Sequence, residues 1–415
     1  MSRSVAVVGA GLAGVTTAYE LAALGCEVQV FERGGSVAEQ ASFSASALLS
    51  PFLPGLSEPP PAPLHWRWHR WRLGRHGGDA AATLAALGPL SLARTRELRR
   101  SLGIDDEASD GLLVALPDTR RRSGAEAQLG AWRALGVPVD LLDSPHARER
   151  EPGLNVDAAL EGTLALGGGG TGNARLFAQQ LRHQAQRLGV GFRFHTTVRA
   201  VTPDGSGVTL RHEHTPPLEA PTRTAGEREA GDTLPQALGP QEARFDAVVV
   251  CNGLEAPALL GQRLPLGALH EASVTAPLRQ LEAHPDLGPK AAFVDLARGV
   301  AIARIGQRVR VSGAPAVTGL KGNHAPDFEA LHRGLQHWFP GSVLHQQVLQ
   351  GQSRRAMPAD GLPVLGASGR PGVWLNLSPG GGWGLSCGTA QVLAHLIAGL
   401  PPAVDITALG PQRLA

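Results

Sequence analysis

Cysteine, lysine and long apolar runs are all scarce in this chain of 415 residues. The three cysteines, Cys26, Cys251 and Cys387, form no CxxC pair, which excludes a disulfide scaffold and a cysteine zinc site and is typical of a reducing compartment. Because no apolar run reaches roughly 18 residues, we expect no membrane-spanning helix. Lysine occurs only at Lys290 and Lys321, which leaves few candidates for lysine chemistry.

Neither sign of charge is in excess. The formal net charge is +2, so no nucleic-acid partner is expected, and an apolar content of 43% is ordinary for a folded protein. The apolar run Val5–Gly14 is broken by glycines and followed by Glu20, with no small-residue cleavage site, so it differs from a signal peptide. We therefore expect a cytoplasmic protein.

The N-terminal segment carries the most informative pattern. Residues 4–8 predict a strand, GAGLAG at 9–14 is a GxGxxG turn that opens a helix, and a second strand over 27–31 ends at Glu32. In this context the first glycine permits a tight turn, the second lets the backbone approach a pyrophosphate, and the third lets helix and strand pack closely. A carboxylate at Glu32 suits ribose hydroxyls. The pattern predicts a dinucleotide site but does not separate NAD from FAD, and the alternative is a glycine-rich turn without a ligand.

A second glycine-rich turn lies near the C-terminus. A strand over 372–377 is followed by PGGGWG at 379–384 and by a helix over 385–398. This order predicts a second anion-binding helix N-terminus, and two such turns indicate one extended cofactor held at both ends. The alternative is a tight turn that binds nothing.

Three other segments are less specific. The small, hydroxyl-rich residues 34–50 either pass close to a cofactor or form a surface loop. The basic, aromatic stretch Trp66–Trp71 forms either a peripheral membrane contact or, as we favour, an amphipathic helix packed on the core. Residues 212–243 are polar and aperiodic, so we expect a mobile insertion, and His212 and His214 are too isolated within it to predict a metal site.

Together these motifs resemble the FAD-dependent D-amino-acid oxidase superfamily, and within it the D-amino-acid dehydrogenase branch. The resemblance covers nearly the whole chain, and its most specific parts are RAMPADGLPVLG at 355–366 and LNLSPGGGWGLSCG at 375–388. The other matching segments are 5–14 with Glu32–Arg33, 39–51, 172–181, 245–253 and 308–313.

This resemblance implies an α/β fold. A discontinuous, Rossmann-like FAD-binding domain of the glutathione-reductase type would be joined to an α+β substrate domain with a mostly antiparallel sheet. The expected FAD-binding domain comprises 1–75, 150–255 and 346–415, and the expected substrate domain comprises 76–149 and 256–345.

The resemblance also implies a site. Arg355 aligns with the arginine that binds the substrate carboxylate, and His270, Glu271 and Trp383 are further candidates near the flavin ring. The only tyrosine, Tyr19, lies in the first helix, so Trp383, His270 or a serine would replace the substrate-orienting tyrosines common in the family. No metal is expected. FAD would bind without a covalent bond through Gly9, Ala10, Gly11, Leu12, Ala13, Gly14, Glu32, Arg33, Ser42, Ser44, Ala45, Ser46, Ala47, Val198, Asn252, Gly253, Gly361, Gly380, Gly381, Gly382, Trp383, Gly384 and Leu385.

The implied reaction is the oxidative deamination of a small amino acid, with the D enantiomer favoured. Hydride transfer from the α carbon to flavin N5 would give an imino acid that water hydrolyses to a 2-oxo acid and ammonia. Alternatives are a glycine- or sarcosine-type oxidase, an oxidase of methylaminomethyl-uridine in tRNA, and a flavin-binding subunit of a larger dehydrogenase. The electron acceptor is open among oxygen, a quinone and a protein. A membrane contact at 66–71 would place the protein on the inner face of the membrane.

Overall fold

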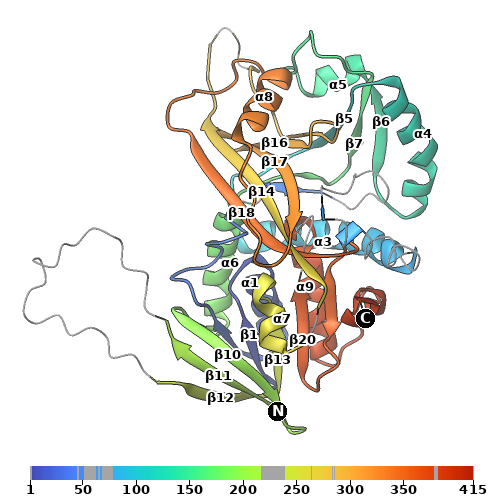
Figure 1. Cartoon of the computed structure of the whole chain (residues 1–415). Helices are drawn as coiled ribbons and strands as arrows, with labels where there is room; N and C mark the ends of the chain where they lie inside the picture. The colour runs from blue at the N-terminus through green and yellow to red at the C-terminus, as the bar shows by residue number, and fades with distance from the viewer. Residues whose placement is uncertain are drawn as a thin grey trace, which may run out of the picture.

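The computed structural model describes residues 2–43, 46–50, 62–63, 66–67, 78–215, 239–262, 264–282, 284, 286–377 and 382–414. Two large sheets lie one above the other in Figure 1, and helices pack around them. Outside the described residues lie the predicted cofactor residues Ser44, Ala45, Gly380 and Gly381, the tryptophans Trp68 and Trp71, and 216–238 of the expected insertion.

The lower sheet has the strand order β19-β20-β13-β1-β2-β9 and is parallel except where β19 meets β20 (Figure 1). Every residue from Val5 to Val8 is buried, because the sheet is covered on both faces. Such a strand needs a continuous apolar run rather than an alternating one. The strands are β1 (Ser4–Val8), β2 (Glu27–Phe31), β9 (Gly191–Arg193), β13 (Ala247–Val250), β19 (Val364–Ala367) and β20 (Val373–Leu377).

Helices cover one face of this sheet. Helix α1 (Leu12–Ala23) packs against both α6 (Ala174–Arg187) and α9 (Gly382–Ile397), and α3 (Gly78–Leu102) packs against α9. A buried ion pair joins α3 to α1, since Arg94 donates to the two carboxylate oxygens of Glu20 at 2.8 and 3.0 Å. The other face is covered by a three-stranded antiparallel sheet of β10 (Thr196–Pro203), β11 (Val208–His214) and β12 (Gln241–Phe245).

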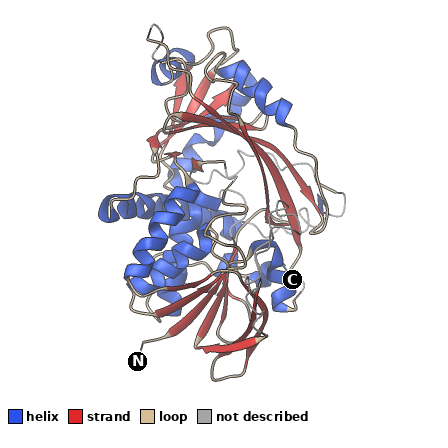
Figure 2. Cartoon of the chain, turned by 90° about the vertical axis from the view of Figure 1, so that its left-hand side faces the viewer, coloured by secondary structure: helices blue, strands red, loops and turns tan. Residues whose placement is uncertain are grey.

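The upper sheet has the order β18-β14-β17-β16-β15-β5-β7-β6 and is antiparallel except for the β15–β5 pair. Its long strands arch down toward the lower sheet in Figure 2. One face is apolar and packs on α8, where the Phe293 and Trp338 rings lie 4.8 Å apart. The strands are β5 (Leu112–Leu116), β6 (Val139–Asp143), β7 (Gly162–Leu166), β14 (Leu266–Pro277), β15 (Ala292–Asp295), β16 (Val300–Ile305), β17 (Arg308–Thr318) and β18 (Leu349–Pro358), and the helices are α4 (Thr119–Ala134), α5 (Ser144–Arg150) and α8 (Phe328–Trp338).

Short elements connect the two parts. A small sheet in the order β3-β8-β4 lies between them and contains β3 (Leu48–Leu49), β4 (Ser109–Asp110) and β8 (Gly170–Thr171). The remaining elements are α7 (Ala256–Leu260) and the 3-10 helices η1 (Gly253–Glu255), η2 (Thr407–Leu409) and η3 (Pro411–Leu414).

The predicted α/β class, with one largely parallel and one largely antiparallel sheet, is confirmed. Two strands lie away from the sheet in which the expected ranges put them. Strands β7 and β18 belong to the upper sheet, although 150–255 and 346–415 were the ranges expected for the FAD-binding domain. Each of these strands forms hydrogen bonds with strands that lie elsewhere in the sequence. The residues next to them in the chain do not reveal such pairing. The domain boundaries themselves stay a prediction.

Trp66 is 5% exposed and packs with Leu269, Val317 and Met357, which agrees with the favoured core-packing interpretation for this residue. No helix in the described part of the chain is long and apolar enough to cross a membrane. Within the same residues, no three His, Cys, Asp or Glu side chains gather as metal ligands.

Candidate active site

The turn between β1 and α1 is tightly packed at two of its three glycines. Gly9 has a φ of +98°, a conformation that favours glycine. A Cβ on Gly14 would lie 1.9 Å from the carbonyl oxygen of Gly9, so only a hydrogen fits there. A Cβ on Gly11 would meet nothing nearer than Ser42 Oγ, at 3.6 Å. Gly9 and Gly14 shape the turn, and Gly11 leaves room beside it.

That room belongs to a cavity of about 670 Å³ at the carboxyl ends of β1, β2 and β13, the edge at which open α/β sheets bind ligands. Gly11 precedes α1 and provides no side-chain cap, and Leu12 N–H donates to Ser42 Oγ at 3.2 Å. The first turn of α1 therefore presents backbone N–H groups and the positive end of the helix dipole to the cavity. Both features suit a phosphate.

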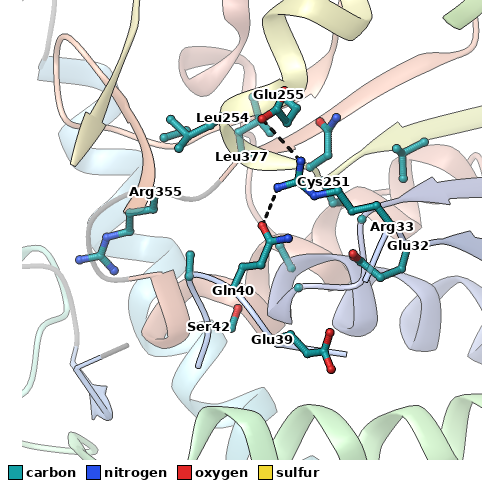
Figure 3. A pocket seen from close by; sticks show the side chains of 18 of the residues that line it. Glu32, Arg33, Glu39, Gln40, Ser42, Cys251, Leu254, Glu255, Arg355 and Leu377 are labelled. Atoms are coloured by element: carbon teal, nitrogen blue, oxygen red, sulfur yellow. Dashed lines mark hydrogen bonds and ion pairs between the residues drawn. The ribbon is translucent and has the colours of Figure 1, made fainter. Parts of the chain in front are cut away.

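Glu32 lies where β2 leaves the sheet. Its Oε2 accepts a hydrogen bond from Ala10 N–H and its Oε1 accepts one from Gly34 N–H, both at 2.7 Å. Beside it, Arg33 donates to Gln40 Oε1 at 2.9 Å, and its Nη1 lies 3.7 Å from a Glu255 carboxylate oxygen (Figure 3). Two backbone groups thus fix the Glu32 carboxylate, and its oxygens keep further lone pairs for a hydroxyl ligand.

The cavity brings together residues that are far apart in sequence. The predicted residues on its wall are Gly9, Gly11, Leu12, Ala13, Glu32, Arg33, Ser42, Val198, Asn252, Gly253, Arg355 and Trp383. Among the described residues, those predicted but not on the wall are Ala10, Gly14, Ser46, Ala47, His270, Glu271, Gly361, Gly384 and Leu385.

Sequence reasoning did not single out several residues on the cavity wall. They include Thr197, Asn376 and Leu377. Asn376 and Leu377 end β20, a parallel strand of the lower sheet. The rule that ligands bind at the carboxyl ends of such strands was the signal that could have found these two.

Four buried polar atoms on the cavity wall have no hydrogen-bond partner among the described residues. They are Asn252 Oδ1, Arg355 Nε, Asn376 Oδ1 and Trp383 Nε1. Buried polar atoms rarely stay unpaired in folded proteins. The unpaired atoms, the N–H groups of α1 and the cavity volume together fit an extended dinucleotide.

The second glycine-rich turn contacts the loop 46–50. A Cβ on Gly384, in the first turn of α9, would lie 2.6 Å from the backbone oxygen of Ser50, so the two segments are in direct contact. Ala47, in the same loop, packs against Ala303 and Ile305 of β16. Segments from opposite ends of the chain therefore meet beneath the upper sheet.

Arg355 extends from β18 at the side of the cavity opposite Glu32 and Arg33 (Figure 3). It donates through Nη2 to Glu271 Oε2 on β14, and each of the two side chains is 16% exposed. The strand register pairs Leu269 with Arg355, which puts Arg355 and Glu271 on one sheet face. The arginine is thus held by a carboxylate on the neighbouring strand.

Arg310 lies on the same face, on β17. Its Nε donates to Thr275 Oγ1 at 3.0 Å and its Nη1 donates to the carbonyl oxygen of Phe43 at 3.1 Å, which ties the upper sheet to the cavity loop. Burial, and then the neighbouring Arg308, lower the pKa of Arg310 to about 10. The side chain still carries its charge at neutral pH.

His270 lies on the opposite face of β14, paired in register with Arg354, at a bulge in the strand. It is buried, and its Nε2 lies 2.9 Å from Thr318 Oγ1. Burial lowers its pKa, and the nearby Arg354 and His324 lower it further. The structure does not bring this predicted candidate to the cavity wall.

Comparison with known proteins finds relatives over nearly the whole chain. The chain is 31% identical, over 99% of its length and 95% of the relative's, to a D-amino acid dehydrogenase of Cereibacter sphaeroides. It is 29% identical, over 99% of both chains, to a D-amino acid dehydrogenase of Bradyrhizobium diazoefficiens.

Solved structures with the same fold include glycine oxidase from Geobacillus kaustophilus, with a TM-score of 0.72 and 22% identity over 100% of this chain and 99% of that one. They also include L-proline dehydrogenase from P. horikoshii, with a TM-score of 0.73 and 14% identity over 99% and 97% of the two chains. The family model of the FAD dependent oxidoreductases, DAO, matches residues 4–396. The chain therefore belongs to the DAO family of FAD-dependent oxidoreductases.

Proposed function

We propose that this protein catalyses the oxidative deamination of α-amino acids, with D-amino acids as its substrates. The relatives named D-amino acid dehydrogenase support this substrate class. When bound, FAD supplies the acceptor for the hydride of the substrate Cα–H bond. The product is an imino acid, which water hydrolyses to a 2-oxo acid and ammonia.

In this proposal the chain's own residues bind and orient both ligands. The N–H groups at the start of α1 hold the diphosphate, and Glu32 accepts hydrogen bonds from ribose hydroxyls. Arg355 holds the substrate carboxylate, because its planar guanidinium can donate two parallel hydrogen bonds. No side-chain base has to abstract the α hydrogen, since it leaves as hydride once the bound ammonium has lost a proton and become the neutral amine.

The observation that carries the proposal is the position of Arg355. Its side chain is 16% exposed and lies on the wall of the same cavity as Gly11 and Trp383. The neighbouring Arg354 also lines the cavity, but its side chain is exposed, projects from the other face of β18 and donates to the carbonyl oxygen of Leu320. Of the two adjacent arginines, Arg355 is therefore the better candidate for carboxylate binding.

We propose in addition that FAD is bound without a covalent link. Cys251 lines the cavity, but burial raises the pKa of its thiol to about 12. Cys387 is fully buried in α9, and burial raises its pKa to about 12 as well. Neither thiol supplies a thiolate at neutral pH, the form in which cysteine reacts. Precipitation of the protein with acid should release all of the yellow colour into the supernatant.

The test of the activity is anaerobic mixing of the purified yellow protein with single D- and L-amino acids, with glycine and sarcosine in the same series. Loss of the oxidised-flavin absorbance with D-amino acids, and 2-oxo acid and ammonia as products under turnover, is the expected result. Flavin that stays oxidised with every amine contradicts the proposal and favours a flavin-binding subunit of a larger dehydrogenase.

A glycine- or sarcosine-type oxidase is the second candidate. The likeness to glycine oxidase favours it, although that likeness alone shows only the fold. Reduction that is faster with glycine or sarcosine than with any D-amino acid bearing a side chain would select this alternative.

A further inference from the structure

The ion pair between Glu271 and Arg355 bears on how an amino acid is recognised. On the basis of the proposed function, we propose that Glu271 binds the substrate ammonium while Arg355 binds the carboxylate. The two side chains then select zwitterionic amino acids and reject carboxylates that lack an amine.

The first step of the argument is the position of the pair. Glu271 and Arg355 project from adjacent strands onto one sheet face. Glu271 accepts a hydrogen bond from Arg355 Nη2, so that donor is already used. Both side chains are largely buried, at 16% exposure each. A carboxylate that reaches Arg355 therefore meets Glu271 as a competitor for the same guanidinium and as a like charge in a poorly solvated place.

The second step follows from this competition. A ligand that brings only a carboxylate must displace Glu271 from Arg355 and leave it without a cation, which is unfavourable for a buried charge. An amino acid brings an ammonium one carbon away from its carboxylate. As Arg355 turns to the ligand carboxylate, Glu271 can pair with the ammonium, and no buried charge is left unpaired.

The third step concerns polar atoms next to the ion pair that have no hydrogen-bond partner. Ser353 lies directly opposite Glu271 in the β14–β18 register and is 2% exposed. Its Oγ has no hydrogen-bond partner among the described residues, and neither does Nε of Arg355. A bound zwitterion would supply an N–H donor and a carboxylate acceptor to such atoms.

The test compares two ligands that differ only in the amine. The first is 2-aminoisobutyrate, which has no hydrogen on its α carbon and so cannot be oxidised by hydride loss, and the second is isobutyrate. Calorimetric titration of the FAD-loaded protein measures the dissociation constant of each. We expect the unmodified protein to bind the amine about tenfold or more tightly than isobutyrate.

Glu271→Gln should change the affinities of the two ligands in opposite directions. The amine should bind about tenfold more weakly, and isobutyrate should bind more tightly, because Arg355 no longer has an internal anion. Glu271→Asp, which keeps the charge, should keep the preference for the amine. The control is Glu329→Gln on α8, where an exposed pair with Arg333 loses one charge far from the cavity and neither constant should change.

Two results would overturn this inference. One is an unmodified protein that shows no preference for the amine. The other is a Glu271→Gln protein that binds both ligands more weakly, which is the result expected if Glu271 only holds Arg355 in position. Both results are binding constants of ligands that do not react. They are therefore separate from the proposed function, which fails if no amino acid reduces the flavin.

Discussion

The glycine turn at 9–14 and the polar sheet face, which is the face of β14 and β18 that carries Glu271 and Arg355, differ in how the chain brings their residues together. Gly9, Gly11, Gly14 and Glu32 come from one short stretch of chain, in which strand, turn and helix follow one another directly. Glu271 and Arg355 are 84 residues apart and meet because β14 and β18 pair in one register. The first site depends on local backbone space, and the second depends on strand alignment, where a slip of one residue would turn Arg355 to the other face.

This comparison predicts that one added methyl group in the glycine turn causes the largest loss of folding stability. Gly14→Ala puts a Cβ 1.9 Å from the Gly9 carbonyl oxygen, where no side chain can move aside. We expect a loss of at least about 3 kcal/mol in the free energy of unfolding, measured by urea denaturation of the FAD-free protein.

A matched control for this variant is Gly130→Ala in α4. That glycine is exposed in a helix, and a Cβ there meets nothing within 4 Å. The same substitution should stabilise the protein by up to about 1 kcal/mol, because alanine favours the helix. Equal effects at the two glycines would remove Gly14 from its role in packing the turn.

The next largest effect is on FAD affinity, and it distinguishes a glycine that leaves room for a ligand from one that packs the turn. Gly11 has a φ of −65°, which any residue can adopt, and its Cβ position is open toward the cavity. Gly11→Val should keep the unfolding free energy within about 1 kcal/mol but lower FAD affinity at least about 100-fold, because the side chain fills the place of the pyrophosphate. Flavin content after purification and a fluorescence titration of the FAD-free protein measure this. A variant that is recovered fully yellow would contradict the assignment.

On the polar sheet face, substitution should affect the substrate and spare the cofactor. Arg355→Leu removes a charge-assisted hydrogen-bond donor and should raise KM for carboxylate substrates by about 30- to 100-fold, with FAD still bound. Arg354→Leu, on the other face of the same strand, should change KM at least tenfold less. Steady-state kinetics of the two variants, with flavin content measured in parallel, give the answer. A KM for Arg355→Leu equal to that of the unmodified protein would remove this arginine from the substrate site.

The sequence alone predicts the glycine turn well, because its geometry is local. Spacing is sufficient to identify the strand, the turn and the following acid, and the structure puts Gly11 and Glu32 on one cavity wall. The two sheet types could also be inferred, since β1 is a continuous apolar run and the strands of the upper sheet mostly are not. These features need no knowledge of distant partners.

The substrate side is less predictable for the same physical reason. Alternation along β14 shows that His270 and Glu271 face opposite ways, but it does not tell which of them faces the cofactor loop. The register with β17 and β18 settles this, and it puts Glu271 beside Arg355 and His270 beside Thr318. The placement of β7 and β18 in the upper sheet depends on the same long-range pairing.

The smallest expected effect concerns the pH dependence of stability and comes from a buried carboxyl beside the upper sheet. Glu151 is 3% exposed and accepts hydrogen bonds from the N–H groups of Lys290 and Ala291 at 2.8 and 3.1 Å, next to β15. Burial raises its pKa from 4.5 to about 6, although these two bonds oppose the shift. The folded protein therefore holds this proton more tightly than the unfolded chain does.

Between pH 4.5 and 6 the folded state binds more protons at Glu151 than the unfolded state, so stability from this group falls as the pH rises and levels off above pH 6. The shift corresponds to about 2 kcal/mol. Glu151→Gln should remove this fall from urea-denaturation curves measured between pH 4 and pH 7, whereas Glu161→Gln, at an exposed position near β7, should leave it in place. Identical pH profiles for the Glu151→Gln variant and the unmodified protein would show that Glu151 titrates normally in the folded state. The pH dependence would then have to come from other groups.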